Sequence, residues 1–311
     1  MQDLVVQRLV WWFGGSPEAV YAFTVLGATL IALWFFKGLR RGDTGDVSVG
    51  LKREQSASLS AKDTKVLSAA KFQPFKIIRS EQVSHNTKLL RFEIPGGFGL
   101  GLPLGRHVSV RAQIEDMKVM RSYTPTSKPS EQGYFELMVK GYELGKMSTH
   151  LCGLKVGDTL EVRGPIGRFK YAPNMYKTIG LIAGGTGITP CLQVIRCVLD
   201  GECQDGDETK FVLFYQNRKE EDILLKPVLD DLQLAYPSRL QIQYFLSNPT
   251  NDAWGQGENE QRGYIQQSFV DCHMATETCQ LVCLCGPSGF NTAMTELVVK
   301  TGHGDDALYV W

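Results

Sequence analysis

The chain has 311 residues, of which 43% are hydrophobic and 21% charged, and its 33 Lys or Arg side chains balance 33 Asp or Glu side chains. This composition is typical of a globular protein and excludes a disordered or fibrous chain. The balanced charge gives no reason to expect a nucleic-acid partner, and the length allows two domains and a tail.

The cysteines contain no paired C-x-x-C motif of the kind that binds zinc, so no metal site is expected. Most of them lie in apolar runs, where small buried thiols are common. This pattern favours a reducing, cytosolic setting. The eight cysteines are Cys152, Cys191, Cys197, Cys203, Cys272, Cys279, Cys283 and Cys285.

An uncharged apolar segment spans residues 19–36. As a helix rising ~1.5 Å per residue, this segment and its flanks would cross a hydrocarbon layer ~30 Å thick. Lys37, Arg40 and Arg41 follow at once, and this positive charge predicts that the rest of the chain stays in the cytosol. A cleaved signal peptide is the alternative, although no clear small-x-small cleavage site follows. Residues 1–41 are therefore expected to form a single-pass membrane anchor.

Residues 42–70 are rich in Ser, Gly, Asp, Lys and Ala, which predicts a linker. Residues 71–171 then contain short alternating runs at 75–79, 88–94, 107–112, 134–139 and 159–162, separated by Gly and Pro turns. Short strands at such intervals, without helical periodicity between them, predict an antiparallel β-barrel.

Two motifs in this barrel region suggest a flavin site. Arg121, Tyr123 and Thr124 supply a cation, an aromatic ring and a hydroxyl from one strand, which are the groups that a flavin dinucleotide needs. Residues 145–148, Gly-Lys-Met-Ser, place backbone N–H groups and a hydroxyl at a helix start, where phosphate binds well. His107 is interpreted as a structural histidine of the barrel.

Residues 172–311 change to an α/β pattern. An apolar strand at 178–182, a glycine-rich turn at 183–190 and an amphipathic helix at 191–199 form the opening of a nucleotide-binding unit. Further strands are expected at 211–215, 240–246 and 280–284, with a helix at 222–234. These segments predict a Rossmann-like parallel sheet. The last motif, Cys285-Gly286-Pro287, ends a buried strand.

Together, the Arg-x-Tyr-Thr-x-x-Ser, Gly-Lys-Met-Ser and Cys-Gly-Pro motifs resemble the NADH-cytochrome b5 reductase family of the ferredoxin reductase superfamily. The likeness runs from about residue 72 to the C-terminus. It implies an FAD-binding barrel followed by an NAD(P)H-binding domain. Electrons would pass from NADH through FAD to a separate haem protein, with cytochrome b5 first among the candidates.

The resemblance also implies the site. Cys285, Tyr123 and Thr124 form the expected catalytic set, in which the Cys285 thiol helps to fix the hydride geometry. The expected cofactor contacts are Arg121, Ser122, Tyr123, Thr124, Val139, Lys140, Tyr142, Gly145, Lys146, Met147, Ser148, Gly184, Gly185, Thr186, Gly187, Thr189, Ser247, Cys285, Gly286 and Pro287.

The chain departs from the family pattern at three places. Ser122 replaces a usual Pro, Ser288 follows the Cys-Gly-Pro motif where animal members continue with proline, and Ser247 replaces a usual Asp. An acid at the last position would repel a 2′-phosphate, and serine does not, so NADPH is an alternative coenzyme.

Two other functions remain open. One is an NADPH-using reductase of the same superfamily that serves another acceptor, such as an oxygenase. The other is a catalytically silent membrane scaffold. The endoplasmic reticulum and the mitochondrial outer membrane are both compatible with the expected anchor.

Overall fold

The computed structural model describes residues 66–201 and 206–311. The predicted anchor and most of the predicted linker lie outside these residues. Within the described ranges, no helix is both long enough and apolar enough to cross a membrane.

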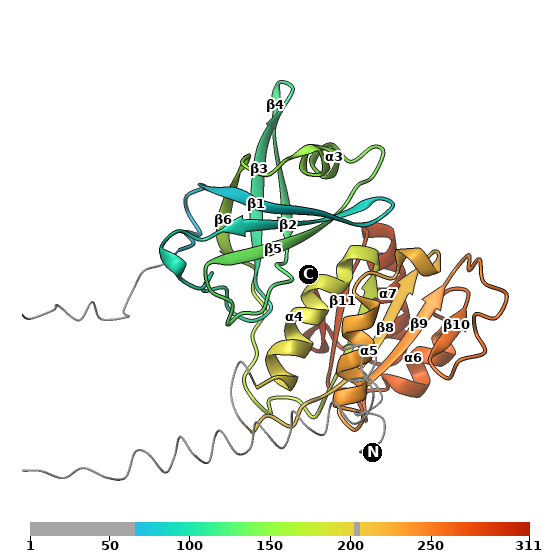
Figure 1. Cartoon of the computed structure of the whole chain (residues 1–311). Helices are drawn as coiled ribbons and strands as arrows, with labels where there is room; N and C mark the ends of the chain where they lie inside the picture. The colour runs from blue at the N-terminus through green and yellow to red at the C-terminus, as the bar shows by residue number, and fades with distance from the viewer. Residues whose placement is uncertain (1–65, 202–205) are drawn as a thin grey trace, which may run out of the picture. The chain divides into compact units, whose positions relative to one another are not determined.

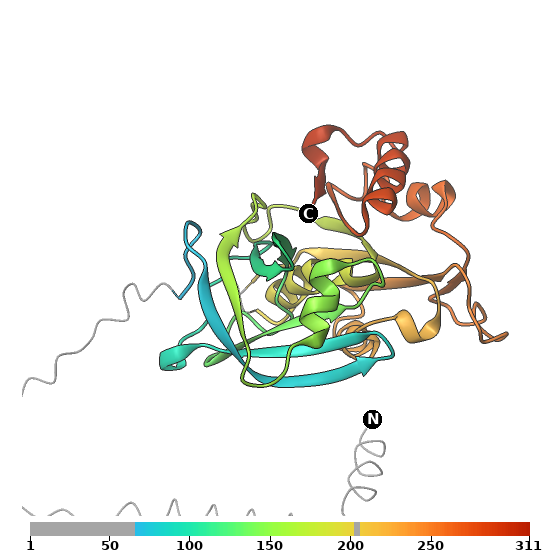
Figure 2. The same ribbon diagram turned by 90° about the horizontal axis from the view of Figure 1, so that it is seen from above.

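The barrel lobe is a six-stranded antiparallel sheet with strand order β4-β3-β6-β1-β2-β5 (Figure 1). Its elements are β1 (Gln73–Ser84), β2 (Thr87–Glu93), η1 (Pro95–Gly97), β3 (His107–Ile114), β4 (Met117–Tyr123), β5 (Tyr134–Lys140), α3 (Lys146–Gly153) and β6 (Thr159–Ile166). Helix α3 packs beside β3, β4 and β5, as the view from above shows (Figure 2).

Strand β1 curves this sheet into a barrel because it pairs with different strands along its length. Its first residues, from Gln73 to Lys76, pair with β6, and its later residues pair with β2, with a register shift after Ile77. Alternate residues point inward along each strand and leave the other face polar. Phe75, Phe92 and Phe135 meet in this interior with ring centroids 5.0–5.3 Å apart.

The nucleotide lobe is a six-stranded parallel sheet with strand order β10-β9-β8-β7-β11-β12. Its elements are β7 (Thr178–Gly184), η2 (Gly185–Gly187), α4 (Ile188–Leu199), β8 (Lys210–Asn217), η3 (Glu220–Asp222), α5 (Lys226–Ala235), β9 (Leu240–Leu246), β10 (Glu260–Arg262), α6 (Gln267–His273), β11 (Leu281–Cys285), α7 (Ser288–Lys300), η4 (Asp305–Ala307) and β12 (Leu308–Val310).

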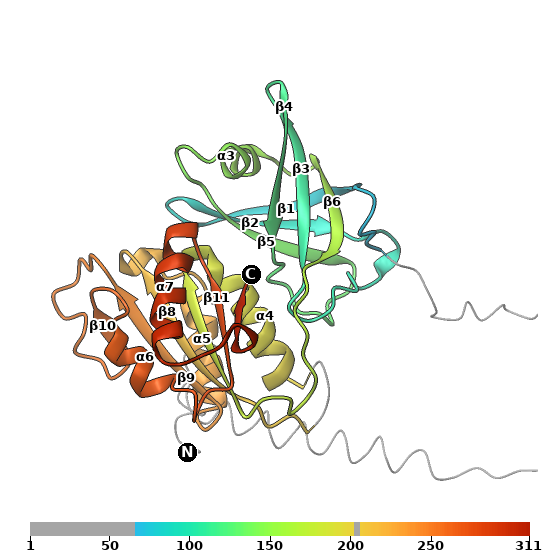
Figure 3. The same cartoon turned by 180° about the vertical axis from the view of Figure 1, so that it is seen from behind.

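Helices cover both faces of the parallel sheet. Helices α4 and α5 pack on one face, in front in Figure 1, and α6 and α7 pack on the other, in front in Figure 3. Because both faces are covered, the central strands are buried along nearly their whole length, and most residues of β8 and β9 are apolar. The strand order reverses between β7 and β11, which lie on either side of a topological switch point.

Hydrogen bonds and an ion pair join the two lobes. The Gln193 side chain on α4 accepts from the Gly105 N–H at 2.9 Å and donates to the Arg106 carbonyl at 3.3 Å. The Trp311 indole N–H donates to the Gly105 carbonyl at 3.1 Å. A third contact, between Lys140 and Asp222, lies at the opposite edge of the barrel lobe. These contacts hold the barrel loops over the carboxyl ends of the parallel strands.

Candidate active site

A cavity of about 1100 Å³ opens where the barrel meets the carboxyl ends of β7 and β11. Such a position, at the switch point of a parallel sheet, is where ligands bind in open α/β folds. Its lining from the barrel lobe is His107, Met117 to Thr124, Met138, Lys140, Tyr142 and Leu144 to Ser148. The nucleotide lobe contributes Thr186, Gly187, Thr189, Pro190, Cys285, Gly286, Pro287 and Trp311.

The strand β4 supplies the barrel wall of the cavity. Arg121 and Tyr123 are two residues apart, so they share one face of the strand, and Thr124 follows directly. Burial raises the pKa of Tyr123 to about 12. Its hydroxyl therefore stays protonated at neutral pH and can donate a hydrogen bond to a ligand.

The start of α3 supplies a site suited to phosphate. No side chain caps this end of the helix, so its first N–H groups are free of a capping bond. The Ser148 hydroxyl instead accepts from the Tyr142 N–H at 3.2 Å and donates to the Gly145 carbonyl at 2.9 Å. A Cβ at Gly145 would lie 2.2 Å from the Ser148 hydroxyl, so a side chain at this position would displace that hydroxyl from its hydrogen bonds. This glycine start and the Arg121 guanidinium provide what an anionic pyrophosphate requires.

The glycine loop after β7 packs against the turn after β11. A Cβ at Gly187 would lie 1.9 Å from the Cys285 carbonyl oxygen, so the missing side chain is what permits this approach. Gly185 has φ of +55°, a left-handed conformation that suits glycine. Its carbonyl accepts from the buried Tyr215 hydroxyl at 3.0 Å. Gly184 and Gly286 leave room for the Phe290 ring, and Gly286 also lines the cavity.

Cys285 ends β11 at the floor of the cavity, and its thiol is free. Burial raises the pKa of this thiol to about 12, so the neutral SH form dominates at neutral pH.

The structure brings most of the expected site residues together but not all of them. Val139 is fully buried in the barrel core. Gly184 and Gly185 come just before the cavity-lining residues of the glycine loop and do not line the cavity themselves. Ser247 lies at the end of β9, outside the cavity lining, where its N–H donates to the Asn217 carbonyl at 3.1 Å. Both polar atoms of the buried Asn217 side chain lack a partner with hydrogen-bond geometry among the described residues, although the amide lies near the Tyr215 hydroxyl.

Two cavity residues lie outside the expected set of site residues: His107 was interpreted as a structural histidine, and Trp311 was not singled out. His107 lines the cavity from β3, and burial, aided by the charge of Arg106, lowers the pKa of its imidazole. Trp311 follows β12 and packs on Phe169 with ring centroids 5.6 Å apart. The apolar character of the final residues was the only sequence signal for a strand there. The contact of Trp311 with the cavity could not be predicted, because it depends on long-range strand pairing.

Within the described residues, no group of three or more His, Cys, Asp or Glu side chains could hold a metal ion.

Family models match both lobes. An oxidoreductase FAD-binding domain matches residues 74–171, and an oxidoreductase NAD-binding domain matches residues 181–296. The fold and the cavity thus define a two-domain flavin and nicotinamide oxidoreductase.

Curated relatives make the assignment narrower. NADH-cytochrome b5 reductase 1 of Debaryomyces hansenii is 41% identical over 79% of this chain and 84% of the relative. The protein of the same name from Dictyostelium discoideum is 39% identical over the same shares. The cytochrome b5 reductase domain of Ulva prolifera nitrate reductase superposes with a TM-score of 0.70 at 31% identity, covering 79% of this chain and 99% of that structure. The chain belongs to the NADH-cytochrome b5 reductase family, as the sequence motifs predicted.

Proposed function

We propose that this enzyme passes electrons from NADH through FAD to cytochrome b5. The observation that carries this proposal is the shared cavity, into which Tyr123, the start of α3, the glycine loop and Cys285 all open. The names of the curated relatives support both the coenzyme and the acceptor. Bound FAD would accept a hydride and release its electrons one at a time.

The residues of the chain would bind and orient the two cofactors. Arg121 and the first turn of α3 would neutralise the pyrophosphate, and Tyr123 and Thr124 would offer hydroxyl donors and a flat ring to the flavin. Cys285 would limit how the nicotinamide approaches, because it lines the cavity at the switch point, its backbone packs on the glycine loop and its thiol stays neutral. No proton needs to leave this thiol.

Purified protein tests this function directly. Wild-type enzyme is expected to reduce cytochrome b5 with NADH, and a mixture that leaves cytochrome b5 oxidised while ferricyanide is reduced would reject the acceptor. The related reductase activity toward an oxygenase would then be the next assignment. A colourless protein would indicate a scaffold without catalysis.

NADPH use is the second candidate because the residues at the ends of β8 and β9 would not repel a 2′-phosphate strongly. Ser247 is partly buried there, and the Asn248 N–H donates to the carbonyl of the exposed residue Arg218 at 2.8 Å, which places Arg218 beside this loop. An Arg near the ribose is the usual partner of a 2′-phosphate.

We also propose that residues 1–41 anchor the enzyme in the endoplasmic reticulum or mitochondrial outer membrane, with the catalytic lobes in the cytosol. The uncharged run at 19–36 and the basic residues that follow it support this proposal. Such a tether would raise the effective concentration of an acceptor held in the same bilayer. Alkaline carbonate extraction of cell membranes should leave the full chain in the pellet, whereas recovery in the supernatant would reject an integral anchor.

A further inference from the structure

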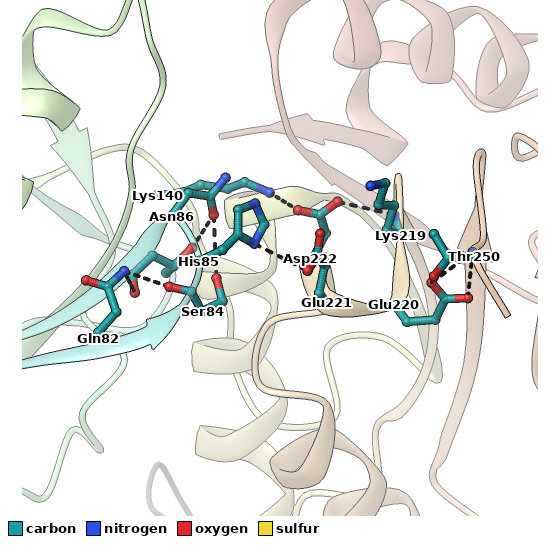
Figure 4. Close-up of polar contacts among 11 residues, drawn as sticks. Gln82, Ser84, His85, Asn86, Lys140, Lys219, Glu220, Glu221, Asp222 and Thr250 are labelled. Carbon is teal, nitrogen blue, oxygen red and sulfur yellow. Dashed lines mark hydrogen bonds and ion pairs between the residues drawn. The ribbon is translucent and has the colours of Figure 1, made fainter.

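The short turn η3, which follows β8, contacts both lobes with consecutive acidic side chains (Figure 4). Asp222 points toward Lys140 of the barrel lobe, and Glu220 points toward the loop after β9. Glu221 lies between them and approaches His85 at the tip of the β1–β2 hairpin. One turn of chain therefore connects the edge of the flavin cavity with the loop that carries Ser247.

The contact with the barrel lobe is a buried ion pair. The Lys140 ammonium lies 2.7 Å from the Asp222 carboxylate, and the side chains are only 13% and 11% exposed. The second Asp222 oxygen accepts from the Lys219 N–H at 3.2 Å, which fixes the carboxylate within its own turn. Lys140 ends β5 and lines the cavity, so the pair places η3 against the cavity wall.

The contact with the loop after β9 uses the other acid. The Glu220 carboxylate accepts from the backbone N–H groups of Thr250 and Asn251, at 3.0 Å and 2.8 Å, and from the Thr250 hydroxyl at 2.8 Å. These are charge-assisted hydrogen bonds, which are stronger than bonds between neutral groups. These bonds hold the loop at Thr250, only three residues beyond Ser247. The family resemblance places the adenosine ribose of the coenzyme at Ser247.

We propose that Asp222 is a positioning residue for the coenzyme: through Lys140 and Glu220 it holds the loop after β9 at a fixed distance from the flavin cavity. This inference rests on the proposed use of a nicotinamide coenzyme. It adds that the turn η3 aligns the binding sites for the two halves of the dinucleotide. The adenosine half binds the loop, the nicotinamide half reaches Cys285, and η3 sets the spacing between them.

Coenzyme kinetics with ferricyanide as acceptor test this role in the full-length flavoprotein. Asp222→Asn keeps the side-chain shape but removes the charge that holds Lys140. The KM for NADH and the inhibition constant of ADP-ribose, which is the coenzyme without its nicotinamide, should rise together by about tenfold, or about 1.4 kcal/mol. The kcat should stay within about twofold, because binding weakens equally in the ground state and the transition state.

Glu221→Gln is the matched control. Glu221 belongs to the same turn and is exposed, and its contact with His85 is long, at 3.8 Å. This variant should keep the wild-type values of KM and kcat. Equal effects of the Glu221 and Asp222 substitutions would contradict a specific role for the buried pair.

A second variant acts from the other end of the turn and leaves the buried pair intact. Glu220→Ala should raise the same two constants, and the double variant with Asp222→Asn should show less than the product of the single effects, because both substitutions break one connection. If Asp222→Asn does not accumulate as folded yellow protein, Glu220→Ala becomes the deciding variant. An unchanged inhibition constant of ADP-ribose in Glu220→Ala would then overturn the proposal.

Two further results would contradict it. A lower KM in Asp222→Asn would mean that Asp222 merely competes with the coenzyme for Lys140. A reduced melting temperature with unchanged KM would mean that the pair only stabilises the fold. Failure of the proposed function is a different result, in which wild-type protein does not oxidise NADH at all.

Discussion

At the scale of single residues, burial rather than charge determines the chemistry of Cys285. The thiol is largely removed from water, and its pKa of about 12 leaves very little thiolate at neutral pH. A protonated thiol is a poor nucleophile, which agrees with a role in orienting the nicotinamide rather than in attack.

This environment predicts slow alkylation. Iodoacetamide at pH 8 should modify the exposed Cys272 well before Cys285, because the reaction needs both access and thiolate. Mass spectrometry of the peptides over time measures both rates. Faster labelling of Cys285 than of Cys272 would show that the cavity thiol is activated.

Ser247 allows a test of coenzyme choice at one position. Ser247→Asp introduces a carboxylate at the end of β9, where it would repel a 2′-phosphate and could bond ribose hydroxyls. The ratio of kcat/KM for NADH to that for NADPH should rise by about tenfold, equivalent to about 1.4 kcal/mol. Ser238→Asp, on the loop before β9 at the opposite end of the sheet, is the control and should leave the ratio unchanged.

At the scale of elements, sequence patterns predicted the antiparallel and parallel sheets and the glycine loop. Strand 240–246 was predicted with the observed bounds, because its mostly apolar residues are typical of a buried parallel strand. The long β1 was predicted only at 75–79, since its second half pairs with β2 while leaving mostly polar side chains exposed. Helices α6 and α7 and the short strands β10 and β12 were not predicted, because their short or weakly patterned segments depend on tertiary packing.

The site was predictable where one motif supplies several groups, as in the strand from Arg121 to Thr124. It was not predictable where a contact joins distant segments. Trp311 reaches the cavity only because β12 pairs with β11, and the Lys140–Asp222 pair joins residues 82 positions apart. Gly187 was expected as a cofactor contact and lines the cavity, but the sequence could not show that the close approach of the Cys285 turn also requires glycine there.

Substitution of Gly187 tests the packing of these two elements. Gly187→Ala would force a methyl group against the Cys285 carbonyl and should destabilise the protein by about 1–3 kcal/mol while lowering activity. Gly289→Ala is the control, because its added Cβ meets no atom within 4 Å and alanine favours the helix α7. Urea unfolding and NADH oxidation measure the two effects. Equal stability and equal activity of the two variants would show that the loop accommodates the added methyl group without loss of stability.

At the scale of the whole molecule, the function depends on two lobes that hold their facing edges in register. Gln193 satisfies a buried N–H at this junction, and its loss would leave the Gly105 N–H without a partner. Gln193→Leu should lower the free energy of unfolding by about 1–3 kcal/mol. Gln241→Leu, an exposed change on β9, should alter it by less than about 0.5 kcal/mol. Matching losses in both variants would argue against a special role for the junction.

The most direct test of the central claim is an anaerobic titration of the purified yellow protein with NADH, followed by addition of oxidised cytochrome b5. The shared cavity predicts that the flavin absorbance bleaches with one equivalent of NADH and returns as two equivalents of cytochrome b5 are reduced. A flavin that keeps its colour with excess NADH and with NADPH would contradict the account.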